Sequence, residues 1–412
     1  MLQRTNTIKF LLIYMFLAMY LQVSAQVGNT LPAWKEGYLD IHHINTGKGE
    51  SVFLILPDGT TMLVDAGATA QAKPRVTDAK PNGSRNPGEW IARYIQHYSP
   101  NPSAPKLDYV LLTHFHDDHI GELYPGLKTR KEGNYALTGI TEVAENIPVG
   151  KLVDRGWPDY NFPAPLTEEY VKNYIRFVKW NVENKGLKAE QFKVGVNNQF
   201  TLLLNQKKYP NFEIRNLSCN GHVWTGVANN ERNYFPNMKD LPQSDYPNEN
   251  KCSIAIRISY GKFDYFNGGD LTTGTQGTWQ DIETPVGLVT GPVEVCEANH
   301  HAYLDAMGTL FLQAVRPRII VLQTWSPSQP DNGVLSRMLS TATYPGPRDI
   351  FATNIMDETK VVIGPRLNSL KSQQGHIVIR VNPGGETYMV YILDDSEENF
   401  RIKSIHGPYI SN

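Results

Sequence analysis

Cysteine is scarce in this sequence, which has only Cys219, Cys252 and Cys296 among its 412 residues. A disulfide framework of the kind that holds small secreted domains together is therefore excluded, and stability has to come from a large hydrophobic core. One pair of the three cysteines can form a disulfide and leave one thiol over, and the sequence does not identify the pair.

A surplus of charge of one sign is also missing, since the formal net charge is −2. This near-neutral balance excludes a global positive field that would attract nucleic acid, although it leaves room for a local basic groove. The sequence has no internal repeat and no low-complexity tract.

Long hydrophobic runs are absent except near the N-terminus. Arg4 and Lys9 precede the apolar residues 10–21, and Val23-Ser24-Ala25 follows them. This order is typical of a secretory signal peptide, because the run is short for a membrane span of about 20 residues and ends at a small-x-small pattern. We predict a signal peptide over residues 1–25 with cleavage after Ala25, a secreted or periplasmic location, and no stable membrane insertion afterwards. An uncleaved N-terminal anchor is the alternative.

Many short apolar segments between turn residues predict an α/β fold. The sequence predicts strands at 38–44, 52–56, 61–65, 107–112, 212–218, 253–260, 262–266, 318–323, 375–381 and 386–393, and helices at 89–98, 166–193 and 304–315. Early hairpins, then alternating strands and helices, then more strands indicate sheets covered by helices. We expect a single domain over residues 26–412 with a helical insertion around residues 160–200.

The densest group of ligand-type side chains follows the strand predicted at 107–112. Residues 113–119 read Thr-His-Phe-His-Asp-Asp-His. Because strand side chains alternate, His114 and His116 can point the same way, while Asp118 and His119 lie where the chain turns into a helix. Burying these groups without a metal or hydrogen bonds would be costly, and imidazoles with carboxylates are the ligands of catalytic zinc. The alternative, a solvated histidine-rich loop, is disfavoured by the density of ligand types.

This run resembles H-x-H-x-D-H, the main motif of the metallo-β-lactamase superfamily. Other motifs of that family follow in order: Leu63 to Gly67 resembles its acidic turn, Phe266 to Asp270 the strand that ends in a bridging aspartate, and Asn299-His300-His301 its last histidine. The resemblance covers most of residues 38–325. It implies the metallo-β-lactamase αββα sandwich, in which two mixed β-sheets are flanked by helices.

The resemblance also implies a ligand set for two metal ions. His114 and His116 would bind the first metal, Asp118 and His119 the second, and Asp270 both. The expected cofactor is Zn²⁺, with two ions, and Mn²⁺ is the alternative. Asp118 is in addition the candidate catalytic residue, which would orient the attacking water or accept its proton.

Three further histidines and one aspartate complete the expected site. Either His300 or His301 would bind the second metal, with a slight preference for His301. His222 stands where the family's third histidine on the first metal should be, but it lacks the usual Thr-Pro-Gly-His context, so a rim or core histidine is an equal alternative. Asp65 would support the site by hydrogen bonding rather than by binding metal.

A finer resemblance is to the competence-protein branch, the hydrolase domain of DNA-uptake channels and its secreted relatives. Gly47-Lys-Gly-Glu-Ser51 resembles the Gly-x-Gly-Asp-Ser turn of that branch and Asn250-Lys-Cys-Ser253 its Asn-x-x-Ser motif, whereas Ala302-Tyr303 replaces Gly-Ser after the last histidines. This branch is similar to phosphodiesterases. It implies a secreted metal-dependent phosphodiesterase that uses a metal-activated water on a small molecule, a phosphate-bearing polymer or nucleic acid. The alternatives are a lactone or amide hydrolase and a non-catalytic surface protein with a relict site.

Overall fold

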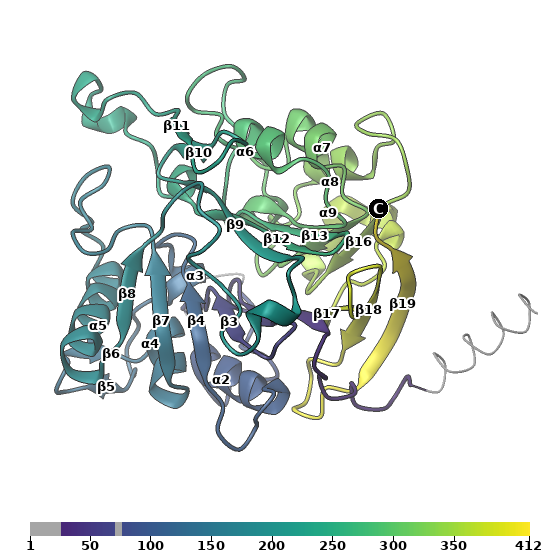
Figure 1. Cartoon of the computed structure of the whole chain (residues 1–412), viewed down its shortest axis with the longest axis horizontal. Coiled ribbons are helices and arrows are strands. Elements are labelled where there is room, and N and C mark those ends of the chain that lie inside the picture. The colour runs from purple at the N-terminus through teal and green to yellow at the C-terminus, as the bar shows by residue number, and fades with distance from the viewer. Residues whose placement is uncertain (1–25, 71–75) are drawn as a thin grey trace, which may run out of the picture.

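The computed structural model describes residues 26–70 and 76–412 (Figure 1). The signal peptide predicted for residues 1–25 therefore lies outside the described residues. Within the described ranges, no helix combines the length and the apolar character that crossing a membrane requires.

The first of two large sheets has nine strands in the order β19-β18-β17-β1-β2-β3-β4-β7-β8. Neighbouring strands are antiparallel from β19 to β3 and parallel from β3 to β8. The strands are β1 (Leu39–His43), β2 (Val52–Ile55), β3 (Thr61–Val64), β4 (Leu107–Leu111), β7 (Val149–Asp154), β8 (Lys188–Gln191), β17 (His376–Val381), β18 (Thr387–Leu393) and β19 (Ile402–Ile410).

The second large sheet has eight strands in the order β11-β10-β9-β12-β13-β14-β15-β16. It is antiparallel from β11 to β13 and parallel from β13 to β16, so both sheets are mixed. Its strands are β9 (Phe212–Cys219), β10 (His222–Trp224), β11 (Glu231–Asn233), β12 (Ala255–Tyr260), β13 (Phe263–Asn267), β14 (Val295–Glu297), β15 (Ile319–Leu322) and β16 (Asp349–Ala352). A small separate hairpin joins β5 (Thr129–Arg130) to β6 (Tyr135–Ala136).

The two sheets pack face to face, and helices cover their outer faces. In β2, Val52 and Leu54 belong to the core between the sheets, while Phe53 and Ile55 belong to the core under the helices, as alternation along a strand requires. Figure 1 shows one helix layer on each side of the sandwich. The layers are α2 (Pro87–Tyr98), α4 (Gly139–Asn146) and α5 (Glu169–Lys185) on the first sheet, and α6 (Glu283–Thr290), α7 (Thr309–Val315), α8 (Asn332–Leu339) and α9 (Asp357–Ile363) on the second. The predicted fold class is confirmed.

Two predicted helices are shorter than their sequence pattern suggested. The helix expected at 166–193 ends at Lys185, because Gly186 has a φ of 72° in the left-handed region and closes the helix. The chain then forms β8, a parallel edge strand beside β7. The region expected as a helical insertion is therefore one helix and one strand of the first sheet.

The helix expected at 304–315 begins only at Thr309, in α7. The buried carboxylate of Glu283 accepts hydrogen bonds from the backbone N–H groups of Met307 and Gly308, at 2.6 and 2.7 Å. These bonds hold the preceding residues in a turn, where they cannot join the helix. The three cysteines are buried and free, so none of them forms a disulfide.

Candidate metal centre

The predicted site residues lie at the ends of strands from both sheets. His114 and His116 follow β4, and the one-turn helix α3 (Asp117–Ile120) carries the next ligand-type side chains. Asp270 follows β13 of the second sheet, and the 3₁₀ turn η5 (Asn299–Ala302) follows β14. The centre therefore spans the seam between the two sheets, and neither sheet supplies it alone.

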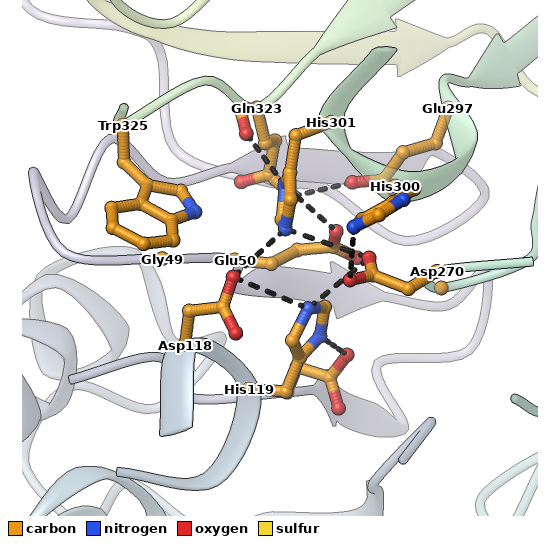
Figure 2. Close-up of polar contacts among 12 residues, drawn as sticks. Gly49, Glu50, Asp118, His119, Asp270, Glu297, His300, His301, Gln323 and Trp325 are labelled. Atoms are coloured by element: carbon orange, nitrogen blue, oxygen red, sulfur yellow. Dashed lines mark hydrogen bonds and ion pairs between the residues drawn. The ribbon is translucent and has the colours of Figure 1, made fainter. Parts of the chain in front are cut away.

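One cluster gathers around the side chains of Asp118, His119, Asp270 and His301 (Figure 2). Asp118 Oδ2 lies 3.0 Å from His301 Nε2 and 3.8 Å from His119 Nε2. Asp270 Oδ1 lies 3.2 Å from His119 Nε2 and 3.5 Å from His301 Nε2. All four side chains are buried.

A second cluster lies on the other oxygen of Asp270. His114 Nε2 is 3.5 Å from Asp270 Oδ2 and 3.1 Å from His116 Nδ1. His114 is fully buried and His116 is half-buried, so this cluster has an open side. The two carboxylate oxygens of Asp270 therefore face different clusters.

The geometry of the Asp118–His119–Asp270–His301 cluster fits a metal ion. For a tetrahedral zinc with ligand atoms about 2.1 Å away, neighbouring ligand atoms are about 3.4 Å apart. The four distances above run from 3.0 to 3.8 Å and bracket that value. Among the described residues, neither His119 Nε2 nor Asp270 Oδ1 has a hydrogen-bond partner, although both atoms are buried. Buried polar atoms without partners are expensive, and a shared cation would satisfy both.

The electrostatics of the Asp118–His119–Asp270–His301 cluster also favour a bound cation. Burial alone would raise the pKa of Asp270, but the neighbouring His119 and His301 hold it well below its usual range. Burial would lower the pKa of His119, but Asp270 and Asp118 raise it well above its usual value. The negative field of Asp270 and Asp118, which raises the pKa of His119, also attracts a metal cation. Burial, with His119 nearby, lowers the pKa of His114, so His114 stays neutral, the form that binds metal.

Asp65 lies behind His119 and fixes its ring. Its Oδ2 accepts hydrogen bonds from His119 Nδ1 at 2.7 Å and from Thr113 Oγ1 at 2.6 Å, and its Oδ1 accepts one from the Thr113 backbone N–H at 2.8 Å. Because His119 donates its Nδ1 proton to Asp65, its Nε2 is directed at Asp270 and Asp118, and it would bind a cation that replaces the Nε2 proton.

The structure distinguishes His301 from His300. His301 donates Nδ1–H to the backbone carbonyl of Gln323 at 2.9 Å. Its Nε2 faces Asp118, in the cluster that also contains His119 and Asp270. His300 points to the rim, where its Nδ1 lies 2.6 Å from Asp305 and its Nε2 3.8 Å from Asp270 Oδ2. Both histidines have positive φ angles, 46° and 53°, a backbone conformation that is strained for residues other than glycine.

His222 is not brought to the site, so its assignment as the third histidine of the first metal is corrected. It lies in β10, near the edge of the second sheet, and its Nδ1 is 2.9 Å from Glu231 Oε1 of β11. Its side chain is 40% exposed. Among the described residues, no group of metal-ligand side chains includes it. Strand pairing at the sheet edge, which the local sequence does not reveal, places this histidine at the rim.

Glu50 belongs to the site and was not predicted from the sequence. Its carboxylate lies within 4.8 Å of ligand atoms of His119, Asp270 and His301, and it is 1% exposed. Burial, with Glu297 nearby, raises its pKa well above the usual range. The available signal was its position in the Gly-Lys-Gly-Glu-Ser turn, where the resembling branch has an aspartate.

Comparison with protein families agrees with this fold. Residues 45–171 match the family described as the metallo-beta-lactamase superfamily, and this range includes Asp65 and the histidine run. The chain has the metallo-β-lactamase fold. Asp270 and His301 of the candidate site lie beyond the range that matches the family.

Solved structures of low sequence identity are also similar. The metallo-β-lactamase fold protein YhfI from Bacillus subtilis is 12% identical, with 82% of this chain and 95% of that chain covered and a TM-score of 0.35. A long form RNase Z from yeast is 13% identical, with 72% and 38% covered and a TM-score of 0.31. The hydrolase AbOPH of the beta lactamase superfamily is 13% identical, with 54% and 55% covered and a TM-score of 0.26. A search of curated proteins gives no match.

Proposed function

We propose that this protein is a metal-dependent phosphodiesterase with a dinuclear site. The observation that carries the proposal is the placement of Asp270, whose Oδ1 faces His119 and His301 while its Oδ2 faces His114. A carboxylate shared in this way holds two cations close together. Two-metal sites with ions about 3.5–4 Å apart suit in-line displacement at phosphorus, because they stabilise both the attacking and the leaving oxygen.

The chain's own residues have separate roles in this proposal. His114, His116 and Asp270 would hold the first ion, and Asp118, His119, Asp270 and His301 the second. When bound, the ions would supply a nucleophile from water near neutral pH and polarise the substrate's phosphoryl oxygens. Asp65 and the Gln323 carbonyl keep the rings of His119 and His301 in the ligand-competent tautomer.

Asp118 would orient the attacking water. Burial would raise its pKa, but His119 and His301 together lower it, so its carboxylate stays ionised. A carboxylate that is hard to protonate is better suited to accept a hydrogen bond from the water than to retain its proton.

The substrate class rests on the turn of residues 47–51. This turn contacts the site directly, since the backbone N–H of Glu50 donates to the carbonyl of Asp118 at 2.9 Å. The turn is the feature that resembles the phosphodiesterase-like branch, and it favours a phosphate-bearing polymer, nucleic acid or a small phosphodiester over a lactone or amide. The His222 position supports the same choice, because small-substrate relatives in this family usually keep a clear third histidine.

The test is hydrolysis of bis-p-nitrophenyl phosphate by the mature protein after loading with Zn²⁺ or Mn²⁺, beside a lactone and a lactam. We expect about two metals per chain and metal-dependent diester cleavage. Asp118→Ala should lower kcat by at least about 10²-fold, and His222→Ala should leave it unchanged. Metal binding with lactone or lactam cleavage alone would refute the phosphodiesterase assignment, and failure to bind metal would refute the enzyme assignment.

We also propose that residues 1–25 direct secretion and are removed. N-terminal sequencing of the exported protein should give Gln26 as the first residue. Recovery of the full-length chain in the membrane fraction would support an uncleaved anchor instead.

A further inference from the structure

Glu50 is fixed against the metal-binding turn by its backbone. Its N–H donates to the carbonyl of Asp118 at 2.9 Å, and its own carbonyl accepts from the N–H of Gly67 at 2.8 Å. The preceding Gly49 has a φ of +136°, and a Cβ at this position would lie 2.2 Å from the carbonyl oxygen of Asp118. Only glycine allows this approach, so the turn is built to bring Glu50 close to the site.

The carboxyl group of Glu50 has few partners for a fully buried polar group. Its Oε1 accepts one hydrogen bond from Asn267 Nδ2 at 3.5 Å, the outer limit for such a bond, and its Oε2 lies 3.8 Å from His301 Nδ1. Within residues 26–70 and 76–412, no lysine or arginine forms an ion pair with it. A buried carboxylate is stable only with a partner of opposite charge or with several hydrogen bonds.

The space next to Glu50 contains atoms that need a cation. His119 Nε2 and Asp270 Oδ1 are buried without hydrogen-bond partners in the described chain, and both residues form a ligand group with Glu50 and His301. In Figure 2, Asp118 approaches His119 and His301 from one side, while Glu50 and Asp270 lie on the other side. The ligand group around Glu50 has two carboxylates and two imidazoles, and Asp118 Oδ2 lies beside it, 3.0 Å from His301 Nε2.

We propose that Glu50 is a further protein ligand of the second metal position, and that this position binds Mn²⁺ more tightly than the first position does. Nitrogen-rich sites with few ligands suit zinc, whereas additional carboxylate ligands suit harder ions such as Mn²⁺. The first position, with His114, His116 and Asp270, is richer in nitrogen. The two positions would therefore differ in their affinity for Mn²⁺. This inference rests on the dinuclear site proposed above, but not on its substrate.

The matched control for Glu50 is Glu297. Glu297 is 2% exposed and belongs to the same polar layer, where it accepts hydrogen bonds from Asn267 Nδ2 and Gln323 Nε2. It reaches the metal position only through those neighbours, and no metal-ligand group of the described residues contains it. Glu297→Gln therefore makes the same buried carboxyl-to-amide change as Glu50→Gln without removing a member of the ligand group.

The experiment is a metal titration of the mature chain. Protein stripped with a chelator is titrated with Mn²⁺ alone and, in parallel, with Zn²⁺ alone, and bound metals are counted by elemental analysis and by the electron paramagnetic resonance signal of Mn²⁺. We expect two ions of either metal per chain, with a tighter and a weaker Mn²⁺ site. Glu50→Gln should lower Mn²⁺ affinity by more than about 100-fold, beyond the range for outer-shell residues, and Glu297→Gln by less than about tenfold.

Each outcome decides one claim. Equal effects of Glu50→Gln and Glu297→Gln on the tighter Mn²⁺ site would overturn the role of Glu50 and leave the phosphodiesterase proposal intact. Fewer than two metals in the unmodified chain would instead overturn the dinuclear site itself. If Glu50→Gln does not fold, X-ray absorption of the manganese-loaded unmodified chain supplies the answer: five or six ligands with mainly oxygen donors support the inference, and four ligands refute it.

Discussion

The bond between Asp65 and His119 offers the sharpest test of how the site is built. Asp65 is fully buried and accepts three hydrogen bonds, from His119 Nδ1 and from the hydroxyl and backbone N–H of Thr113. Asp65→Ala would leave all three donors unpaired, at a cost of about 1–3 kcal/mol of stability each. A loss of metal binding in this variant could then not be distinguished from unfolding. Asp65→Asn keeps the shape and is the better perturbation.

An asparagine cannot satisfy the three donors in either orientation. If its amide nitrogen faces the Thr113 backbone, the asparagine N–H and the Thr113 N–H, both donors, face each other. If the nitrogen faces His119, the imidazole has to accept at Nδ1, and its proton moves to Nε2, the atom that faces Asp270 at 3.2 Å. In that tautomer Nε2 has no lone pair for a metal. Outer-shell changes of this kind cost about 10–100-fold in metal affinity, which is about 1.4–2.7 kcal/mol.

The assay is chelator competition for zinc, with thermal unfolding of the metal-loaded and chelator-treated protein in parallel. Asp154→Asn is the control, because Asp154 is equally buried and accepts four hydrogen bonds, from Tyr160, Tyr174 and the backbone of Gly156 and Trp157. We expect Asp154→Asn to lower stability without changing metal affinity, and Asp65→Asn to weaken metal binding. Unchanged zinc affinity in Asp65→Asn, or the same loss in both variants, would refute this account of Asp65.

Three further predictions concern other residues. Gly49→Ala places a methyl group 2.2 Å from the Asp118 carbonyl, so we expect it to displace the turn and lower metal occupancy in elemental analysis, whereas Gly346→Ala, with no atom near its Cβ, should leave occupancy unchanged. His222→Ala should keep the full metal content, and a loss of one ion per chain would restore it as a ligand. Burial raises the pKa of Glu283 to about 7 from 4.5, so its contribution to stability is complete below pH 4.5 and is lost as pH rises through about 7. This loss amounts to roughly 3 kcal/mol, and the fall in Tm between pH 5 and 8 should shrink in Glu283→Gln; an unchanged fall would show that another group causes it.

Local patterns were sufficient to predict several strands and to single out the histidine run, whereas the metallo-β-lactamase sandwich was predicted from the resemblance. The alternation in residues 52–56 and the strand before Thr113 depend on neighbours along the chain, and the structure has strands at both places. The histidine run could be predicted as a ligand cluster for the same reason, because a turn directly after a strand end brings neighbouring side chains of the run together. Asp65 and Asp270 were found through their order along the chain, which follows the resemblance to a known fold.

The remaining features depend on contacts between distant segments. His300 and His301 are adjacent in sequence, and only the positive φ angles of η5 direct one inward and the other to the rim. Glu50 joins the site because Gly49 packs on Asp118, a contact between two loops. His222 leaves it because β10 pairs with β11. Of these three features only Glu50 had a signal in the local sequence, its position in the Gly-Lys-Gly-Glu-Ser turn.

The position of the centre at the seam has a consequence for the order of assembly. Thr113 to His119 and Asp65 come from the first sheet, whereas Asp270 and His301 come from the second, so no intermediate with only one sheet formed can hold the complete ligand set. Metal binding would therefore occur late in folding, after the two sheets have packed against each other. A bound ion would then cross-link the two sheets. Its removal should first loosen the packing between the sheets, before any strand within a sheet unfolds.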